Sequence, residues 1–214
     1  MPLPLESSID DTPALHDRAM KDLSFIRRTM EGAASFTDVP GWGLVMTGVT
    51  AIAAARVAAA QPSAGGWFAT WMLEAVIGAT IGGAMMWRKI QQHRRPSGAP
   101  ILSAPARKFM LSFWPAVAAG AVLTFATLDS EMLRQPSSAV PRILPGLWLL
   151  LYGVGVTTAG AHSVRAVPLM GAGLCVIGSV TLLVRGISGN VMLALGFGVW
   201  QIACGLWIAR RHGG

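Results

Sequence analysis

The sequence predicts an all-α, polytopic membrane protein: a bundle of six transmembrane helices preceded by a cytoplasmic or interfacial amphipathic helix. Composition is the first reason, since 53% of the residues are hydrophobic and 13% are charged, whereas roughly a quarter of the residues in a soluble domain are charged. The second reason is that six apolar segments are each long enough to cross a bilayer as a helix. The third is that proline, glycine and serine, which interrupt helices, gather between those segments.

Residues 1–38 form a polar N-terminal segment, and an amphipathic helix is expected at about residues 13–34. Thr12 suits an N-cap and Pro13 the first helical position. Apolar residues then recur every three or four positions, at Leu15, Ala19, Leu23, Ile26, Met30 and Ala33. This helix either covers the cytoplasmic mouth of the bundle, lies in the headgroup layer, or docks a soluble protein partner. The first eleven residues lack a basic and an apolar region, so no cleaved signal peptide is expected.

The six spans are expected at about residues 40–60, 67–87, 109–128, 143–161, 167–184 and 191–209. They make up a transmembrane domain over residues 39–209, and residues 210–214 form a short tail. With a cytoplasmic N-terminus, thirteen of the 17 basic residues lie on the cytoplasmic side. Basic loops stay in the cytoplasm, so both termini are predicted there. The excess of basic residues on the cytoplasmic side of the membrane explains the net charge of +7. The expected partner is therefore the lipid bilayer rather than nucleic acid.

The second span, from Trp67 to Trp87, contains one acid, Glu74. Several residues recur every four positions on one face of this helix: Thr70, Glu74, Gly78 and Gly82. The glycines Gly78 and Gly82 predict close packing against another helix. An ionisable group at this depth costs at least about 2.5 kcal/mol, so something must bond it, pair with it or keep it protonated.

Three further polar side chains within or near the spans are candidates for interaction. Arg56, in the first span, is expected at a depth similar to that of Glu74, and an ion pair would satisfy both; Arg185 is the alternative partner. The remaining alternative for Glu74 is that it has no ion-pair partner and carries a proton. Gln201, in the sixth span, is expected to form a hydrogen bond across the bundle.

Residues 40–49 and 145–154 share the pattern P-G-x-x-L-x-x-x-G-V. Three spans separate the two copies, so the halves of the chain would have opposite orientations, as in a 3+3 inverted repeat. The alternative is that proline and glycine are simply common where membrane helices begin.

The runs F-I-R-R-T-M-E at 25–31, S-F-T at 35–37 and P-G-W-G at 40–43 resemble the start of a group of uncharacterised bacterial integral membrane proteins with six spans and an N-terminal amphipathic helix. The resemblance covers only residues 25–43 and implies a bacterial inner membrane. It implies no activity and assigns no functional residue.

Motifs of known intramembrane enzymes are missing from the sequence. It lacks a G-x-S-G nucleophile with a later intramembrane histidine, an H-E-x-x-H zinc motif, a C-x-x-C pair and histidines within the spans for haem. We therefore expect no catalytic residue, metal or cofactor. The leading hypothesis is a non-enzymatic membrane subunit, sensor or assembly partner that docks through its N-terminal helix. The alternative is a small secondary transporter or channel using Glu74, and either form is compatible with a homo-oligomer.

Overall fold

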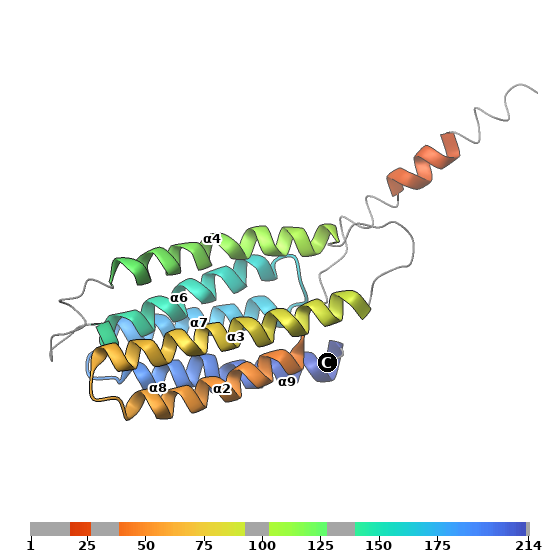
Figure 1. The fold of residues 1–214 in the computed structure, drawn as a ribbon. Helices are drawn as coiled ribbons and strands as arrows, with labels where there is room; N and C mark the ends of the chain where they lie inside the picture. The colour runs from red at the N-terminus through yellow and green to blue at the C-terminus, as the bar shows by residue number, and fades with distance from the viewer. Residues whose placement is uncertain (1–17, 27–38, 93–102, 128–139, 213–214) are drawn as a thin grey trace, which may run out of the picture. The chain divides into compact units, whose positions relative to one another are not determined.

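The computed structural model describes residues 18–26, 39–92, 103–127 and 140–212, which are mostly helical and contain no strand (Figure 1). The chain divides into two units, Met1–Ala34 and Ser35–Gly214. In the first unit, residues 18–26 form a helix. Its apolar side chains Met20, Leu23 and Ile26 are 51 to 61% exposed. An N-terminal helix is therefore confirmed over residues 18–26, and the remainder of the predicted range lies outside the described residues.

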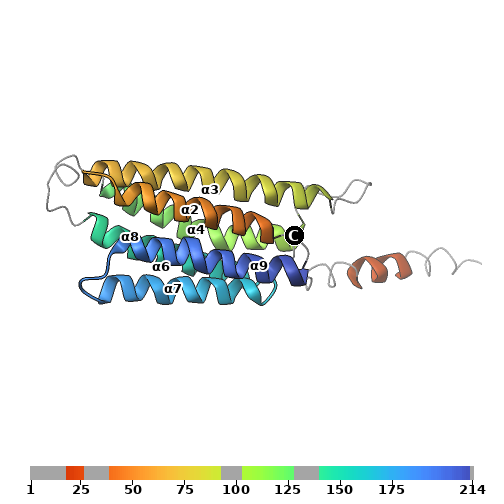
Figure 2. The same cartoon turned by 90° about the horizontal axis from the view of Figure 1, so that it is seen from below.

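The described residues of the second unit form six apolar helices that alternate in direction along the bundle (Figures 1 and 2). Five are continuous: α2 (Gly41–Ala59), α3 (Ala64–Gln92), α4 (Ala104–Ala126), α6 (Val140–Gly160) and α7 (Ala166–Leu183). The sixth combines α8 (Gly189–Leu193), the π-helix η1 (Ala194–Trp200) and α9 (Gln201–His212). All six are long and apolar enough to cross a membrane. The prediction of a multi-pass, six-span helical membrane protein is confirmed.

Three helices begin three or more residues before the expected start of their spans, and hydrogen bonds at their first turns explain two of these cases. The helix α3 contains the span expected from Trp67 but begins at Ala64, where the Ser63 hydroxyl accepts a hydrogen bond from the Gly66 N–H at 3.1 Å. Ser103 is likewise the N-cap of α4, and its hydroxyl accepts a hydrogen bond from the Ala106 N–H. This helix begins at Ala104, five residues before the expected start of the span at residue 109. α6 begins at Val140 rather than at residue 143. Each extension shortens a predicted loop.

The first and last spans are in close backbone contact through glycines seven residues apart. On α2, a Cβ atom at Gly41 would lie 2.7 Å from the Gly205 carbonyl oxygen, and one at Gly48 would lie 2.9 Å from that of Gly198. The relation is reciprocal, since a Cβ atom at Gly205 would lie 2.8 Å from the Gly41 oxygen. Real Cβ atoms do not approach this closely, so α2 and the sixth span require glycine at these positions.

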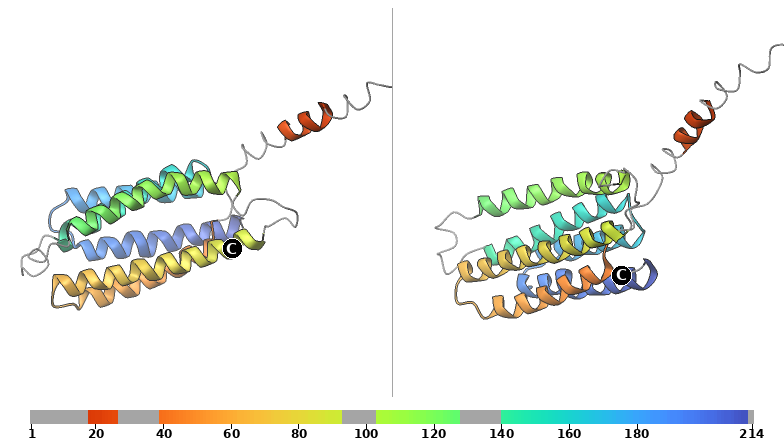
Figure 3. Two further views of the ribbon diagram at one scale, coloured as in Figure 1. Left: turned by 45° about the horizontal axis from the view of Figure 1, so that its top comes forward. Right: turned by 45° about the vertical axis from the view of Figure 1, so that its right-hand side comes forward.

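The same arrangement joins α6 to α7. A Cβ atom at Gly153 would lie 2.7 Å from the backbone nitrogen of Cys175, and one at Gly178 would lie 2.6 Å from that of Leu150. Gly146 and Gly171 complete the contact from their respective helices. Two antiparallel pairs, α2 with the sixth span and α6 with α7, thus form the tightly packed part of the bundle (Figure 3).

These contacts explain the sequence pattern shared by residues 40–49 and 145–154. Both glycines of each copy are contact glycines: Gly41 and Gly48 in α2, and Gly146 and Gly153 in α6. The two copies use these glycines against different partners, since α2 packs Gly41 and Gly48 against the sixth span and α6 packs Gly146 and Gly153 against α7. Close helix packing accounts for the pattern, and the 3+3 repeat stays a prediction.

Tryptophans join the remaining helices to this framework. Trp67 of α3 is buried and stacks on Trp148 of α6, with ring centroids 5.8 Å apart. Trp67 therefore packs inside the protein instead of facing the headgroup layer. The Trp148 indole N–H also donates to the Thr124 hydroxyl of α4 at 2.8 Å, and α4 lies at the edge of the bundle against α6 (Figure 1).

Candidate functional site

Glu74, the acid within the second span, is held by a hydroxyl group. The Thr50 side chain of α2 donates a hydrogen bond to Glu74, with 2.8 Å between Oγ1 and Oε1. The expected ion pair with Arg56 is wrong: Arg56 is exposed, and no ion pair joins it to Glu74 in the part of the chain that the structure describes.

The early start of α3 explains why Glu74 meets Thr50. Glu74 lies ten residues after Ala64 and Thr50 lies nine residues before Ala59, at the two ends of the connection between α3 and α2. At ~1.5 Å per residue, both are about 14 Å from that end of the bundle. Arg56 is three residues from Ala59 and only about 4.5 Å from the same end. The two charged groups are therefore nearly two helical turns apart in depth.

Gln201, the first residue of α9, extends this contact toward the sixth span. Its Nε2 group donates to the Thr47 hydroxyl of α2 at 2.7 Å, which confirms the hydrogen bond expected across the bundle. Thr47 in turn donates to the Leu44 carbonyl oxygen at 3.0 Å. Gln201 is 94% buried, and its Oε1 atom has no hydrogen-bond partner among the described residues. A buried acceptor without a partner costs about 1–3 kcal/mol, so its retention calls for an explanation.

Thr47, Thr50, Glu74 and Gln201 form what we call the polar cluster, which draws on α2, α3 and the sixth span. Thr47 and Thr50 are linked because the Thr50 hydroxyl lies 2.9 Å from the Thr47 carbonyl oxygen. Thr50 is near the middle of α2, so the polar cluster lies near the middle of the bundle along the helix axes, with Thr47 and Gln201 buried and Thr50 and Glu74 partly buried.

The sixth span is irregular where it meets the polar cluster. Seven residues, Ala194–Trp200, form a π-helix that ends immediately before Gln201. Within it, Gly198 packs against Gly48 and Ile52 of α2. Long π-helical segments are rare, and π-bulges often occur at functional sites. The sequence offered one signal for it, the closely spaced glycines Gly196 and Gly198.

Among the described residues, neither Gly78 nor Gly82 makes a close backbone contact with another helix, so their predicted packing role stays a prediction. A Cβ atom at Gly82 would meet nothing within 4 Å. A Cβ atom at Gly78 would lie 3.9 Å from both Glu74 Oε1 and Thr47 Cγ2, which is ordinary van der Waals distance. Gly78 therefore lies beside the carboxyl group and faces α2.

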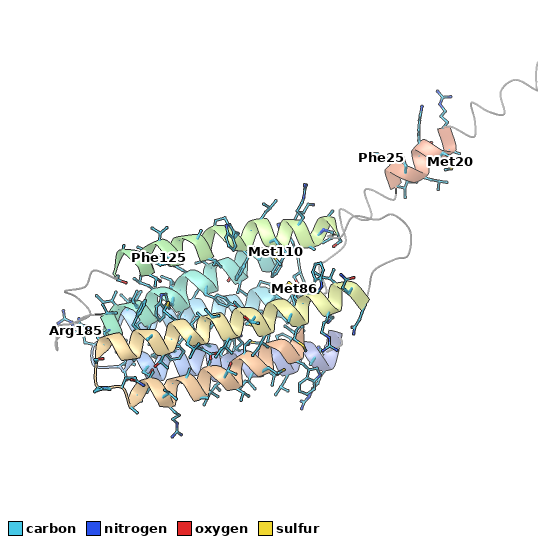
Figure 4. The ribbon with its side chains drawn as sticks, in the orientation of Figure 1. Met20, Phe25, Met86, Met110, Phe125 and Arg185 are labelled. Atoms are coloured by element: carbon cyan, nitrogen blue, oxygen red, sulfur yellow. The ribbon has the colours of Figure 1, made fainter. Side chains whose placement is uncertain are left out.

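The other candidate residues lie away from the polar cluster. Arg185 is exposed at the end of the bundle, beyond α7 (Figure 4), and the structure shows no contact between it and Glu74. The Cys175 thiol lies 3.7 Å from the Leu150 carbonyl oxygen, and Cys204 is buried in the apolar core. Sequence reasoning missed Thr47 and Thr50, although threonines three positions apart in a span of alanine, glycine and valine were a visible signal.

No match to this chain was found among protein family models, curated proteins or solved structures. The chemistry of the polar cluster rests on one carboxyl group, two hydroxyl groups and one amide. In the described ranges, no group of three or more His, Cys, Asp or Glu side chains could hold a metal ion. Hydrogen bonding and charge are the interactions that the polar cluster offers.

Proposed function

We propose that this multi-pass membrane protein is a small secondary transporter or channel, without enzymatic activity, whose binding site is the polar cluster. The observation that carries the proposal is the combination of Glu74 with the buried, unpartnered oxygen of Gln201 at the end of a π-helix. Polar groups in a membrane interior are expensive and generally functional. Transporter sites lie near the membrane midplane where a helix departs from regular geometry.

The alternative explanation for Glu74 was a structural ion pair, which would need no substrate. The structure replaces that pair with a hydrogen bond from Thr50, a neutral donor. A neutral partner leaves the charge of an ionised Glu74 uncompensated, so Glu74 either carries a proton or binds a cation. This is the behaviour that a transport site needs, and it favours the transporter hypothesis over a purely structural bundle.

Proteoliposomes loaded with a pH-sensitive dye would test the transport function. A panel of alkali-metal ions, ammonium, amines and amino acids is applied as gradients, and proton movement is recorded. We expect at least one solute to drive proton movement in the wild type, and Glu74→Gln to abolish it. Gly82→Ala is the matched control because its new methyl group meets open space. Proton movement that Glu74→Gln leaves unchanged would refute the site, and its absence with every solute would refute the function.

We also infer that both termini face the cytoplasm of a bacterial inner membrane. The thirteen-to-four distribution of basic residues supports this topology. In the described bundle, basic residues gather at the end where α2 begins: Arg88, Lys89, Arg107, Lys108, Arg165, Arg210 and Arg211. The resemblance of residues 25–43 to uncharacterised bacterial six-span proteins supports the same location.

A second candidate function, a membrane subunit or assembly partner, is favoured by the N-terminal helix. Met20, Leu23 and Ile26 are all more than half exposed within their own unit, and an exposed apolar face is typical of an interaction surface. Changing Leu23 and Ile26 to aspartate should leave membrane insertion intact and remove a polypeptide that co-purifies in mild detergent. If the double variant retains the same co-purifying polypeptide, this helix is not the docking element.

A further inference from the structure

We propose that the polar cluster binds a proton and a small univalent cation in competition, so that each expels the other. The inference rests on the proposed binding site and names what the site takes. It would make the protein an exchanger of protons for cations, because one carboxyl group cannot hold both at once.

The hydroxyl group of Thr50 shows why the proton-bound form is stable. Thr50 Oγ1 lies 2.8 Å from Glu74 Oε1 and 2.9 Å from the Thr47 carbonyl oxygen. A hydroxyl group has one hydrogen to donate, so both contacts are hydrogen bonds only if one of the other oxygens carries a proton. Only the carboxyl group can do so. In that state Glu74 donates to Thr50, Thr50 donates to Thr47, and the three groups are satisfied.

The ionised form leaves acceptors without donors. Thr50 then gives its single hydrogen to the carboxylate, while Thr47 already donates to the Leu44 carbonyl oxygen. The Gln201 amide nitrogen is bonded to Thr47, and Gln201 Oε1 has no partner in the described part of the chain. The unused hydrogen-bonding capacity of the polar cluster is therefore that of acceptors, and its charge is negative. Such a site recognises a cation.

Charged groups of the neighbouring helices do not supply that cation. Arg56 is the one charged residue of α2 and is exposed near its end. On α6, Arg142 is exposed near the helix start, and Tyr152 packs between Phe113 and Phe197. On α3 itself, the described cations Arg88 and Lys89 lie at least fourteen residues from Glu74, or about 21 Å along the helix. One carboxylate balances one positive charge, so the expected ligand is univalent.

Burial of the polar cluster limits the size of the ligand. Thr47 and Gln201 are only 7% and 6% exposed, so a cation that reaches their oxygen atoms must be small, such as an ammonium or alkali-metal ion. Gly78 offers a test of this position, because a carbon atom added there would lie 3.9 Å from Glu74 Oε1 and from Thr47 Cγ2. The methyl group of Gly78→Ala would therefore lie beside the carboxylate without a clash that would unfold the protein.

The exchange step is balanced in charge and atoms. The O–H bond of the Glu74 carboxylic acid breaks, the proton leaves to solvent, and the cation takes its place beside the carboxylate. The polar cluster remains neutral overall in both states, which avoids the cost of an uncompensated charge in the membrane.

The test is proton release from purified protein in weakly buffered detergent solution. Sodium, potassium, ammonium, magnesium or tetraphenylphosphonium chloride is added, and proton release is followed together with the infrared carbonyl band of protonated carboxyl groups. We expect a small univalent cation to release one proton per cation bound and to remove the band. Glu74→Gln should abolish both signals, Gly78→Ala should weaken cation affinity by about tenfold or more, and Gly82→Ala should leave it unchanged.

Several results would overturn the inference. Release by magnesium at the same concentrations would show that the site is not selective for univalent cations. Tetraphenylphosphonium binding that Gly78→Ala leaves intact would refute the small site. Proton release that persists in Glu74→Gln would place the exchange at another group. Glu74-dependent release in detergent without flux in proteoliposomes would support this inference and refute transport, whereas flux without such release would refute this inference alone.

Discussion

The glycine contact between α6 and α7 predicts a large loss of stability for the single substitution Gly178→Ala. The new Cβ atom would lie 2.6 Å from the Leu150 nitrogen and 2.9 Å from the Gly146 oxygen, both backbone atoms. Backbone atoms cannot rotate away, and ordinary contact begins at 3.4 Å, so the helices must separate by about 0.8 Å. Inserting a methyl group into a close-packed contact costs about 1–3 kcal/mol.

Thermal unfolding in mild detergent, followed by circular dichroism, would measure this cost. For a chain of this size, about 2 kcal/mol corresponds to a decrease in Tm of roughly 4–8 °C. Gly82→Ala is the matched control on α3, because its Cβ atom meets nothing within 4 Å. Replacing glycine by alanine in a helix is by itself stabilising by about 0.5–1 kcal/mol, so the control should melt at or above the wild-type temperature.

A coupling measurement sharpens the same reasoning. Gly153→Ala opens the same pair of helices, so its effect should be less than additive with that of Gly178→Ala. Gly48→Ala acts on α2 and the sixth span and should be additive with Gly178→Ala. If Gly178→Ala and the Gly82→Ala control have the same Tm, the backbones of α6 and α7 do not approach each other closely at Gly178.

Four further predictions follow from individual contacts. The Asn190 side chain accepts a hydrogen bond from the Trp71 indole N–H and donates one to the Ala55 carbonyl oxygen. Asn190→Ala removes both and should lower the free energy of unfolding by about 1–3 kcal/mol in the same melting assay. Trp148→Phe loses its bond to α4 and should cost about 1 kcal/mol; an unchanged Tm would show that this bond does not secure α4. Gln201→Leu removes the unpartnered oxygen, so Tm should be unchanged or raised while cation affinity falls, and unchanged affinity would exclude Gln201 from the site. A single cysteine at position 63, in place of Ser63, should react with an impermeant thiol reagent in outer-membrane-permeabilised cells, and one replacing Ser97 should not; the reverse result would invert the topology.

The spans could be predicted from the sequence because their signal is local. An apolar run of about twenty residues must cross the membrane whatever its neighbours are. Helix ends were less predictable, since Ser63 and Ser103 cap helices that begin within segments rich in proline and glycine. That difference of about one turn at Ala64 placed Glu74 at the depth of Thr50 instead of Arg56.

The contacts between helices could not be predicted because they depend on the partner. The four-residue spacing of Gly78 and Gly82 predicted that they share a face with Glu74, but it could not show that this face meets α2 through threonine side chains instead of a close backbone contact at the glycines. The seven-residue spacing of Gly41 and Gly48 was equally visible and carries the packing. Nothing in the spacing itself distinguishes a glycine that contacts a backbone from one that meets open space.

The pairing of the first and last spans constrains how the protein can be assembled during synthesis. Gly41 and Gly48 find their partners on a helix that is translated about 150 residues later. Until Gly198 and Gly205 have entered the membrane, that face of α2 can contact only lipid or a helper protein, whereas α6 and α7 can join as a hairpin as soon as both have been inserted. The sixth span is therefore synthesised last. A translation arrest before Gly189 should yield an inserted intermediate in which α2 can still be cross-linked to the insertion machinery.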